Sequence, residues 1–354
     1  METFPHAGRS MRPLPRVGDV ISISRVAPDQ YDAPAPGSVA SGSGSGAETP
    51  ADAVRRIAAS ASAVDGSTPL DEATVLSLRH RGLAGKSLWL ARDDMDRVIG
   101  FALAEEAADH VAIHLVVEPS ARRAGVGGAL AREALDALPG RRVTAWSHGN
   151  HPAAARLADT LGLVRVRDLW VMRRPLSSET PRPPADPAGG IVVRPFVPGR
   201  DEEAFLALNA EAFVGHPEQG RMTRADLEER MAEPWFDPEG FFLAEPADAP
   251  PGAEDAVESP ALLGFHWTKV HDELVGEVYV VGISPAAQGR GLGRLLTLTG
   301  LHHLARRGLA EVVLYVEADN APAVAVYSGL GFTHADADTH VMYERRAPEP
   351  AAGE

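Results

Sequence analysis

Cysteine is absent from the 354-residue sequence. The chain therefore has no disulfide bond, no thiolate metal site and no cysteine nucleophile. It has no run of about 18 apolar residues, so the sequence predicts no membrane-spanning helix. Positive charge is scarce as well, since 34 Lys and Arg stand against 49 Asp and Glu, a formal net charge of −15. Such a chain is a poor general binder of nucleic acid or anionic membrane, and it would have to hold an anionic ligand with local backbone donors.

What is present suits a globular protein. Apolar residues make up 44% of the chain and charged residues 23%, and the length allows two domains. Without cysteine or a secretory signal, the protein is expected in the cytoplasm. Composition predicts a disordered tail at 1–50, a Pro-rich linker at 176–190 and a short tail at 348–354. Two blocks remain, 51–175 and 191–347.

The two blocks share one order of elements. Each has a helix, three strands, a glycine loop, a second helix, a strand, a short helix and a last strand, an α/β (α+β) arrangement. The loops read RRAGVG at 122–127 and QGRGLG at 288–293, a constant offset of 166 residues. Further on, LGL at 161–163 answers LGF at 330–332. The sequence therefore predicts a duplicated domain.

Each glycine loop joins a strand to a helix. A helix N-terminus presents unpaired N–H groups and partial positive charge, and glycine lets a phosphate approach the backbone closely. The loop is thus a candidate pyrophosphate cradle, with nearby arginines adding charge. A Rossmann site would need a small residue where Arg294 stands, and a Walker loop would need a following Gly-Lys-Ser/Thr. A tight strand-to-helix turn without a ligand remains an alternative when one loop is considered alone.

The pattern Q/R-x-x-G-x-G/A after an apolar strand resembles the acetyl-CoA loop of the GCN5-related N-acetyltransferases (GNATs). The second block also carries Asn320, Tyr327 and Gly331–Phe332 in that family's spacing. The resemblance covers nearly all of 51–347. It implies two tandem GNAT domains, each with a mixed, largely antiparallel central sheet flanked by helices, and acetyl-CoA as co-substrate.

The residues around the loops distinguish the two copies. Glu277 lies eight residues before the Pro that precedes the second loop, and the constant offset places Val111 at the same position in the first block. Tyr327 corresponds to Leu157 or Ala158. Neither aliphatic counterpart can move a proton. We therefore expect the C-terminal domain to catalyse acetyl transfer and the N-terminal domain to be an acetyl-CoA-binding domain without catalysis. The alternative that the first loop holds no acetyl-CoA stays open.

Several strings in the sequence, among them GHPEQG, GFHWTKVH and LYVEADN, resemble the mycothiol synthases, a tandem branch of the GNAT family. That resemblance implies acetyl transfer to the cysteinyl amine of desacetylmycothiol (cysteinyl-glucosaminyl-inositol). The amine would attack directly, with Glu277 as general base and Tyr327 as general acid. Alternatives left open are acetylation of another small amine or a protein N-terminus, and a non-catalytic acyl-CoA sensor.

The resemblance also implies a set of contacts. The substrate contacts are Glu72, Glu218, Lys269, Glu277 and Tyr315. The acetyl-CoA contacts in the first domain are Leu115, Val116, Val117, Arg122, Arg123, Ala124, Gly125, Val126 and Gly127. Those in the second domain are Val281, Gly282, Ile283, Gln288, Gly289, Arg290, Gly291, Leu292, Gly293, Arg294, Asn320, Ala321, Pro322, Ala323, Val324 and Ala325.

The polar strings suggest how the acceptor is held. His216, His266 and His271 lack the spacing of metal ligands, so no metal is expected. We interpret the strings around Glu218 and Lys269 as the lining of a pocket that binds the hydroxyl groups of a charged small molecule. His266 and Trp267 are expected to line this pocket as well. Its task would be to present the amine rather than the competing thiol. No nucleic-acid or membrane partner is expected, and the chain is expected to act as a monomer.

Overall fold

The computed structural model describes residues 21–33, 48–107, 109–177, 190–215, 219–247 and 262–346. The chain divides into two compact units, one made of residues 1–167 and 340–354 and the other of residues 168–339. Most of the expected N-terminal tail, most of the expected linker and the expected C-terminal tail lie outside the described residues.

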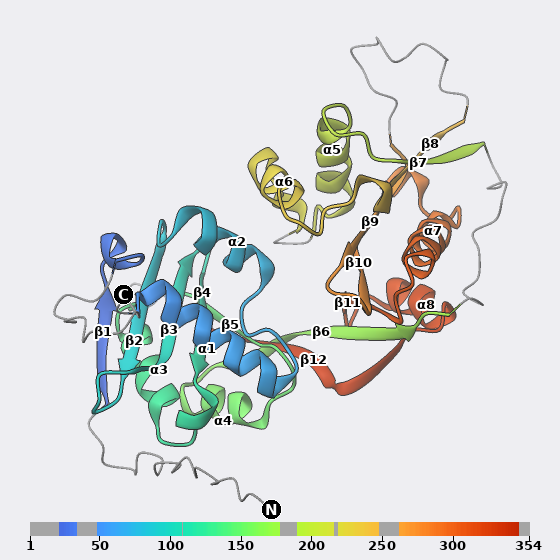
Figure 1. The fold of residues 1–354 in the computed structure, drawn as a ribbon. Coiled ribbons are helices and arrows are strands. Elements are labelled where there is room, and N and C mark those ends of the chain that lie inside the picture. Colours follow the sequence, from blue (N-terminus) through green and yellow to red (C-terminus); the bar gives the residue numbers. More distant parts are fainter. Residues whose placement is uncertain are drawn as a thin grey trace, which may run out of the picture. The chain divides into compact units, whose positions relative to one another are not determined.

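The first unit is a sheet with strand order β1-β2-β3-β4-β5-β12, covered by four helices of its described residues (Figure 1). Neighbouring strands are antiparallel except β4 and β5, which are parallel. Its elements are β1 (Ser22–Val26), α1 (Pro50–Asp65), α2 (Glu72–Arg81), β2 (Lys86–Arg92), β3 (Val98–Glu106), β4 (Val111–Val117), α3 (Val126–Asp136), β5 (Val143–Ser147), α4 (Pro152–Thr160) and the end of β12 (Thr333–Arg345).

The second unit repeats this plan with strand order β6-β11-β10-β9-β8-β7, and β10 and β11 form the parallel pair. Its elements are β6 (Val164–Pro175), β7 (Ile191–Pro195), α5 (Glu202–Ala212), α6 (Arg224–Met231), β8 (Phe241–Pro246), β9 (Gly264–Val270), β10 (Val275–Ile283), α7 (Leu292–Arg306), β11 (Glu311–Glu317) and α8 (Ala321–Gly329). Within the described residues, no helix is long and apolar enough to cross a membrane.

Both units bury apolar clusters on the two faces of their sheets. In the first, Ile57 of α1 and Phe101 of β3 belong to one cluster, and Leu130 of α3 packs in another with Ile113 of β4. Successive side chains of a strand point to opposite faces, so α1 covers one face and α3 the other. The predicted arrangement of a central sheet flanked by helices is therefore present in the structure.

The last strands are exchanged between the halves of the sequence. Val341–Arg345 of β12 pair with β5 in the first unit, whereas Leu169–Pro175 of β6 pair with β11 in the second. The compact units therefore differ from the sequence-order domains 51–175 and 191–347. Sequence order could not reveal this, because an apolar strand fits the edge of either sheet equally well.

The expectation that residues 1–50 form a tail without structure is wrong for β1. Ser22–Val26 pair in antiparallel register with β2. The side chains explain this, since Ile23 packs against one apolar cluster and Val26 and Tyr31 are buried in another. The short apolar stretch was hidden by the surrounding Pro, Gly and Ser.

Candidate active site

The two glycine loops have the same backbone geometry. Gly125 and Gly291 precede α3 and α7 with φ of 85° and 78°, in the left-handed region that favours glycine. Neither helix start has a side-chain cap or an acidic residue in its first turn. A Cβ added at Gly291 or Gly293 would meet nothing within 4 Å. Each helix start therefore has N–H groups without intrahelical partners, and no side chain crowds the glycines of the second loop, an arrangement that fits a pyrophosphate.

Beside each loop, the parallel strand pair separates. β4 pairs with β5 from Val111 to Ile113, but β4 continues to Val117. β10 pairs with β11 from Val275 to Val278 and continues to Ile283. Beyond these points the facing backbone groups of the two strands are not paired with each other. The predicted contacts 115–117 and 281–283 both lie on these parted ends.

A β-bulge distinguishes β10 from β4. The register of β10 against β9 shifts between Val278 and Val280, whereas β4 runs against β3 without a shift. The extra residue means that the constant sequence offset fails upstream of the bulge. The counterpart of Glu277 is therefore Ala112, and the assignment of Val111 is wrong. Alanine also lacks a proton acceptor, so the contrast between the copies stands.

Glu277 lies in a buried position of β10, with 5% of its surface exposed. Its Oε2 is 2.6 Å from Nε2 of His271, a residue just beyond the end of β9. Lys269 of β9 is its cross-strand partner. The three polar side chains alternate along one face of the β9–β10 pair. The structure thus brings together a carboxylate, an imidazole and an ammonium group, two of which the sequence predicted.

Aromatic rings surround the ammonium group. Nζ of Lys269 lies 4.6 Å from the ring centre of Trp235 and 5.2 Å from that of Tyr279. Nε of Arg230 donates a hydrogen bond of 2.9 Å to the hydroxyl of Tyr279. These contacts hold the lysine head next to Glu277 through cation–π attraction. A ring beside a hydrogen-bonding cation is a suitable surface for a polyhydroxylated ring.

Tyr327 lies on the other face of the same sheet. It packs against the apolar cluster that contains Val278 of β10, and Val278 points away from the face that carries Glu277. Its ring packs edge-on against the ring of Phe332, with the two ring centres 5.9 Å apart. Burial raises the pKa of Tyr327 to about 12, so the phenol keeps its proton at neutral pH. A proton acceptor and a proton donor therefore lie on opposite faces where β10 and β11 part.

The structure places the remaining predicted residues as follows. Tyr315 is 44% exposed on β11, just past its last pair with β10. Asn320 caps α8, accepting a 3.2 Å hydrogen bond from the Ala323 N–H. Glu72 is the first residue of α2 and belongs to the first unit, whereas Lys269, Glu277 and Tyr315 belong to the second. Glu218 lies outside the described residues.

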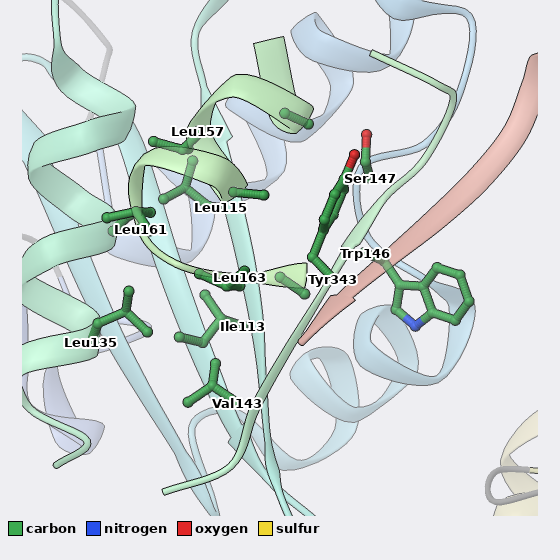
Figure 2. A pocket seen from close by; sticks show the side chains of 14 residues that line it. Ile113, Leu115, Leu135, Val143, Trp146, Ser147, Leu157, Leu161, Leu163 and Tyr343 are labelled. Atoms are coloured by element: carbon green, nitrogen blue, oxygen red, sulfur yellow. The ribbon is translucent and has the colours of Figure 1, made fainter. Parts of the chain in front are cut away.

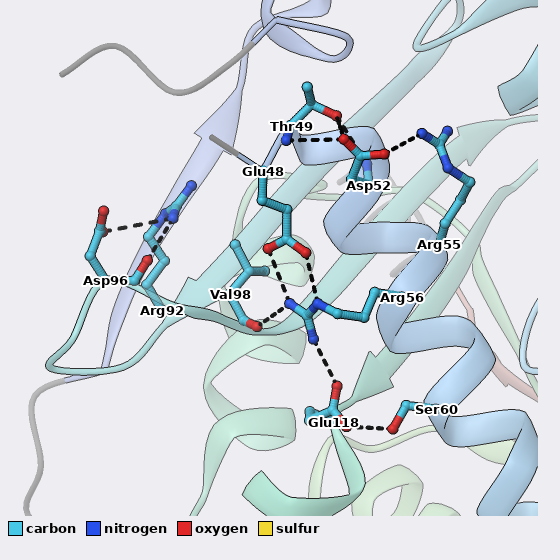
Figure 3. A network of polar contacts seen from close by, with 10 residues as sticks. All are labelled: Glu48, Thr49, Asp52, Arg55, Arg56, Ser60, Arg92, Asp96, Val98 and Glu118. Carbon is cyan, nitrogen blue, oxygen red and sulfur yellow. Dashed lines mark hydrogen bonds and ion pairs between the residues drawn. The ribbon is translucent and has the colours of Figure 1, made fainter. Parts of the chain in front are cut away.

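Arginine–carboxylate pairs tie α1 to the segment that leads into the first loop and to the loop itself, and Figure 3 shows the contacts of Arg56. Arg56 of α1 donates to Glu118, four residues before the start of loop 122–127, at 3.0 Å and to the Val98 carbonyl at 2.9 Å. The guanidinium of Arg122 bonds both oxygens of Asp65 at 2.7 and 2.8 Å, and this hydrogen bonding lowers the pKa of Asp65. Asp65 thus neutralises the charge of Arg122, so an anion at this loop would be bound by the main-chain N–H groups.

His266 and Trp267 do not line an open pocket, contrary to expectation. Both are fully buried in the second unit. Nδ1 of His266 lies 2.7 Å from the Leu296 carbonyl, and burial lowers the pKa of this histidine to about 4. Trp267 stacks on Phe241 with ring centres 4.6 Å apart. Of the string GFHWTKVH, only Lys269 and His271 belong to the candidate site.

Sequence reasoning missed three contributors: His271, Trp235 and Tyr279. The signal for His271 was its alternation with Lys269, which places both on the face of Glu277. Tyr279 carried the same signal, because it alternates with Glu277 along β10, whereas Trp235 precedes β8 and reaches the site only through the fold. Within the described residues, no group of three or more His, Asp or Glu side chains is arranged to hold a metal ion.

Comparison with known sequences gives a consistent picture. The profile of the acetyltransferase (GNAT) family matches residues 53–163 and 206–332. A mycothiol acetyltransferase of Nocardioides sp. is 53% identical over 83% of this chain and 97% of its own length. That of Thermobispora bispora is 50% identical over 84% of this chain and 97% of its own length.

Solved structures share the fold at lower identity. A GCN5-related N-acetyltransferase from Sphaerobacter thermophilus superimposes with a TM-score of 0.61 at 22% identity, over 94% of this chain and 96% of that one. A tandem GNAT protein from the clavulanic acid biosynthesis pathway gives 0.62 at 19% identity, over 94% and 100%. At this identity the likeness concerns the fold alone.

Proposed function

The chain belongs to the GNAT family of acetyl-CoA-dependent N-acetyltransferases, and from that premise we propose that it acetylates the cysteinyl amine of desacetylmycothiol. Relatives about 50% identical over most of the chain are mycothiol acetyltransferases. The observation that carries the proposal is the placement of Glu277 and Tyr327 on opposite faces of the parted strands beside the second glycine loop.

Cofactor binding follows from the loop geometry. The main-chain N–H groups at 288–294, at the start of α7, would hold the pyrophosphate of acetyl-CoA, and the parted end of β10 at 281–283 would hold its pantetheine arm. The start of α8, from Asn320 to Ala325, would border the same region. Bound acetyl-CoA supplies an activated acetyl group. The residues that remain to be explained are those that move protons and orient the acceptor.

Glu277 acts as the general base. A cysteinyl amine has a reference pKa of about 7.7–8.0, so a carboxylate beside it, or a carboxylate-bound water, is a sufficient acceptor for its proton. His271 holds Oε2 of Glu277 at 2.6 Å and leaves Oε1 to face the amine. Tyr327 gives its proton to the departing thiolate on the opposite face. The amine gains the acetyl group and loses one proton, and the sulfur of coenzyme A gains one.

Selection of nitrogen over sulfur depends on orientation. The acceptor's thiol has a reference pKa of about 8.5 and is a rival nucleophile. Lys269, held against Trp235 and Tyr279, faces the same side as Glu277 and would bind the sugar and inositol hydroxyls together with Glu218. Glu72 and Tyr315 would add further contacts. With the rings fixed in this way, the amine rather than the sulfur meets Glu277.

The first unit would bind acetyl-CoA without transferring its acetyl group. Its loop, residues 122–127, and the parted end of β4, residues 115–117, repeat the geometry of the second unit. Ala112 and Ala158 stand where the second unit has Glu277 and Tyr327. A cradle without a base or an acid retains a ligand but has no means of moving protons.

The direct test follows loss of the thioester absorbance of acetyl-CoA in the presence of cysteinyl-glucosaminyl-inositol. This signal is preferable to thiol detection because the acceptor itself carries a thiol. We expect thioester loss and a product that has gained one acetyl group while keeping a thiol that reacts with maleimide. No thioester loss, or a product that maleimide cannot label, would overturn the proposal. Glucosamine and a peptide N-terminus serve as comparison amines.

A further inference from the structure

The first unit contains an apolar pocket with a volume of about 110 Å³ (Figure 2). It lies among β4, β5, α3, α4 and the end of β12. Its lining is mostly apolar and includes Ile113, Ala145, Ser147, Leu157, Ala158 and Tyr343. The hydroxyl of Ser147 donates to the Gly149 carbonyl at 2.8 Å. The lining thus offers a ligand mostly hydrocarbon.

The second unit carries larger side chains at the corresponding positions. Ala145 is opposite Ile113 in the first unit, as Leu314 is opposite Val278 in the second. In the short helices, α4 begins at residue 152 and α8 at residue 321, so the seventh residue is Ala158 in one and Tyr327 in the other. Leucine and tyrosine are replaced by two alanines. The pocket is therefore the space that these larger side chains occupy in the catalytic copy.

The pocket lies where the reactive end of a coenzyme A thioester would be. Ile113 marks the point at which β4 and β5 part. It is four residues before the end of β4, about 13 Å at the usual rise of a strand. A pantetheine arm that starts at loop 122–127 and follows β4 would bring its sulfur to this point. In the second unit the same place holds Tyr327, the proposed donor to that sulfur.

Building on the proposed cofactor binding by the first loop, we propose that the first unit binds coenzyme A thioesters whose acyl chain is longer than acetyl, with about four carbons. The chain lies in the pocket beside Ala145 and Ala158. An apolar cavity of about 150 Å³ holds benzene, so a cavity of this size and character suits a short aliphatic chain. No acyl transfer follows, because Ala112 and Ala158 move no proton. The first unit would thus sense acyl-CoA species that the catalytic copy does not use.

Native mass spectrometry of the full chain tests this by counting bound ligands during titration with acetyl-CoA or butyryl-CoA. Two additional buried methylenes are expected to tighten binding at one of two sites by about 15-fold. Ala158→Tyr and Ala145→Leu copy the second unit and fill the pocket. Each is expected to abolish the preference for butyryl-CoA while leaving acetyl transfer unchanged. Ala137→Phe, at an exposed position at the far end of α3, is the matched control and should keep the preference.

Three outcomes would overturn the inference. Equal affinities for the two thioesters at both sites would show that the pocket takes no acyl chain. A preference that persists in both pocket-filling variants would place the chain elsewhere. Binding of only one coenzyme A thioester per chain would remove the first cofactor site itself, and with it the inference. Proposed catalysis in the second unit is judged separately, because thioester loss with the cysteinyl acceptor does not depend on the first site.

Discussion

Replacing His271 tests whether Glu277 works as an oriented base. The hydrogen bond between Nε2 and Oε2 is 2.6 Å long and joins a group that is 5% exposed. Hydrogen bonds to charged groups contribute about 1.5–3 kcal/mol, and each 1.36 kcal/mol is a factor of ten in rate. His271→Ala should therefore lower kcat by about 10- to 150-fold, with the KM for acetyl-CoA unchanged. His271→Gln keeps an amide donor and should recover part of the loss.

A double-mutant cycle makes this prediction decisive. Glu277→Gln alone should reduce kcat by about 10²–10⁴, the usual contribution of a general base. Since His271 acts through Glu277, the double variant should be no slower than Glu277→Gln alone. Thioester loss with the cysteinyl acceptor is the assay. If the two losses multiplied, or if His271→Ala were fully active, the imidazole would not orient the base and the reasoning would be refuted.

Three further predictions concern the acid, the acceptor and pH. Tyr327→Phe keeps the ring packing but removes the hydroxyl, so kcat should fall by about 10²–10⁴ at an unchanged KM. Burial raises the pKa of Tyr327 to about 12, so its ionisation should cause no loss of rate below about pH 11. A loss of rate near pH 10 that Tyr327 caused would contradict this. Lys269→Ala should raise the KM for the cysteinyl acceptor about 10- to 100-fold, whereas an unchanged KM would remove Lys269 from the acceptor site. Burial lowers the pKa of His266 from 6.5 to about 4, so as pH falls the unfolded chain takes up a proton before the folded chain does. The free energy of unfolding should therefore fall by about 3 kcal/mol between pH 6.5 and 4. His266→Gln should flatten that pH dependence in urea unfolding, and an identical slope would exclude the histidine as its source.

The glycine loops could be predicted because their cause is local. Gly289 and Gly291 have φ of 77° and 78°, a conformation that side chains rarely adopt, and the helix after them needs no further partner to orient its N–H groups. Glu277 and Tyr327 could also be named from the sequence as candidates. Glu277 lies on β10, the strand that leads into the loop, whereas α7, β11 and most of α8 separate the loop from Tyr327, whose position was indicated by the resemblance.

Features that arise from tertiary contacts were not predictable. The bulge between Val278 and Val280 leaves no mark in the letters of β10, and a fixed offset therefore gave Val111 instead of Ala112. His266 was expected at a polar pocket, yet it fills the core against α7, where its ring nitrogen meets the Leu296 carbonyl. A polar residue in a strand can face either way, and only the packing of the neighbouring helix decides which.

The exchange of β6 and β12 has a consequence for how the protein is made. The edge of β5 is covered by Val341–Arg345, a segment close to the end of the chain. During synthesis the edge of β5 therefore stays unpaired until residues 341–345, which follow the whole second unit in the sequence, have left the ribosome. Domains usually fold one after another as they emerge. Here the N-terminal half finishes folding last, and a chain cut short before residue 341 would leave an open strand edge ready to pair with another molecule.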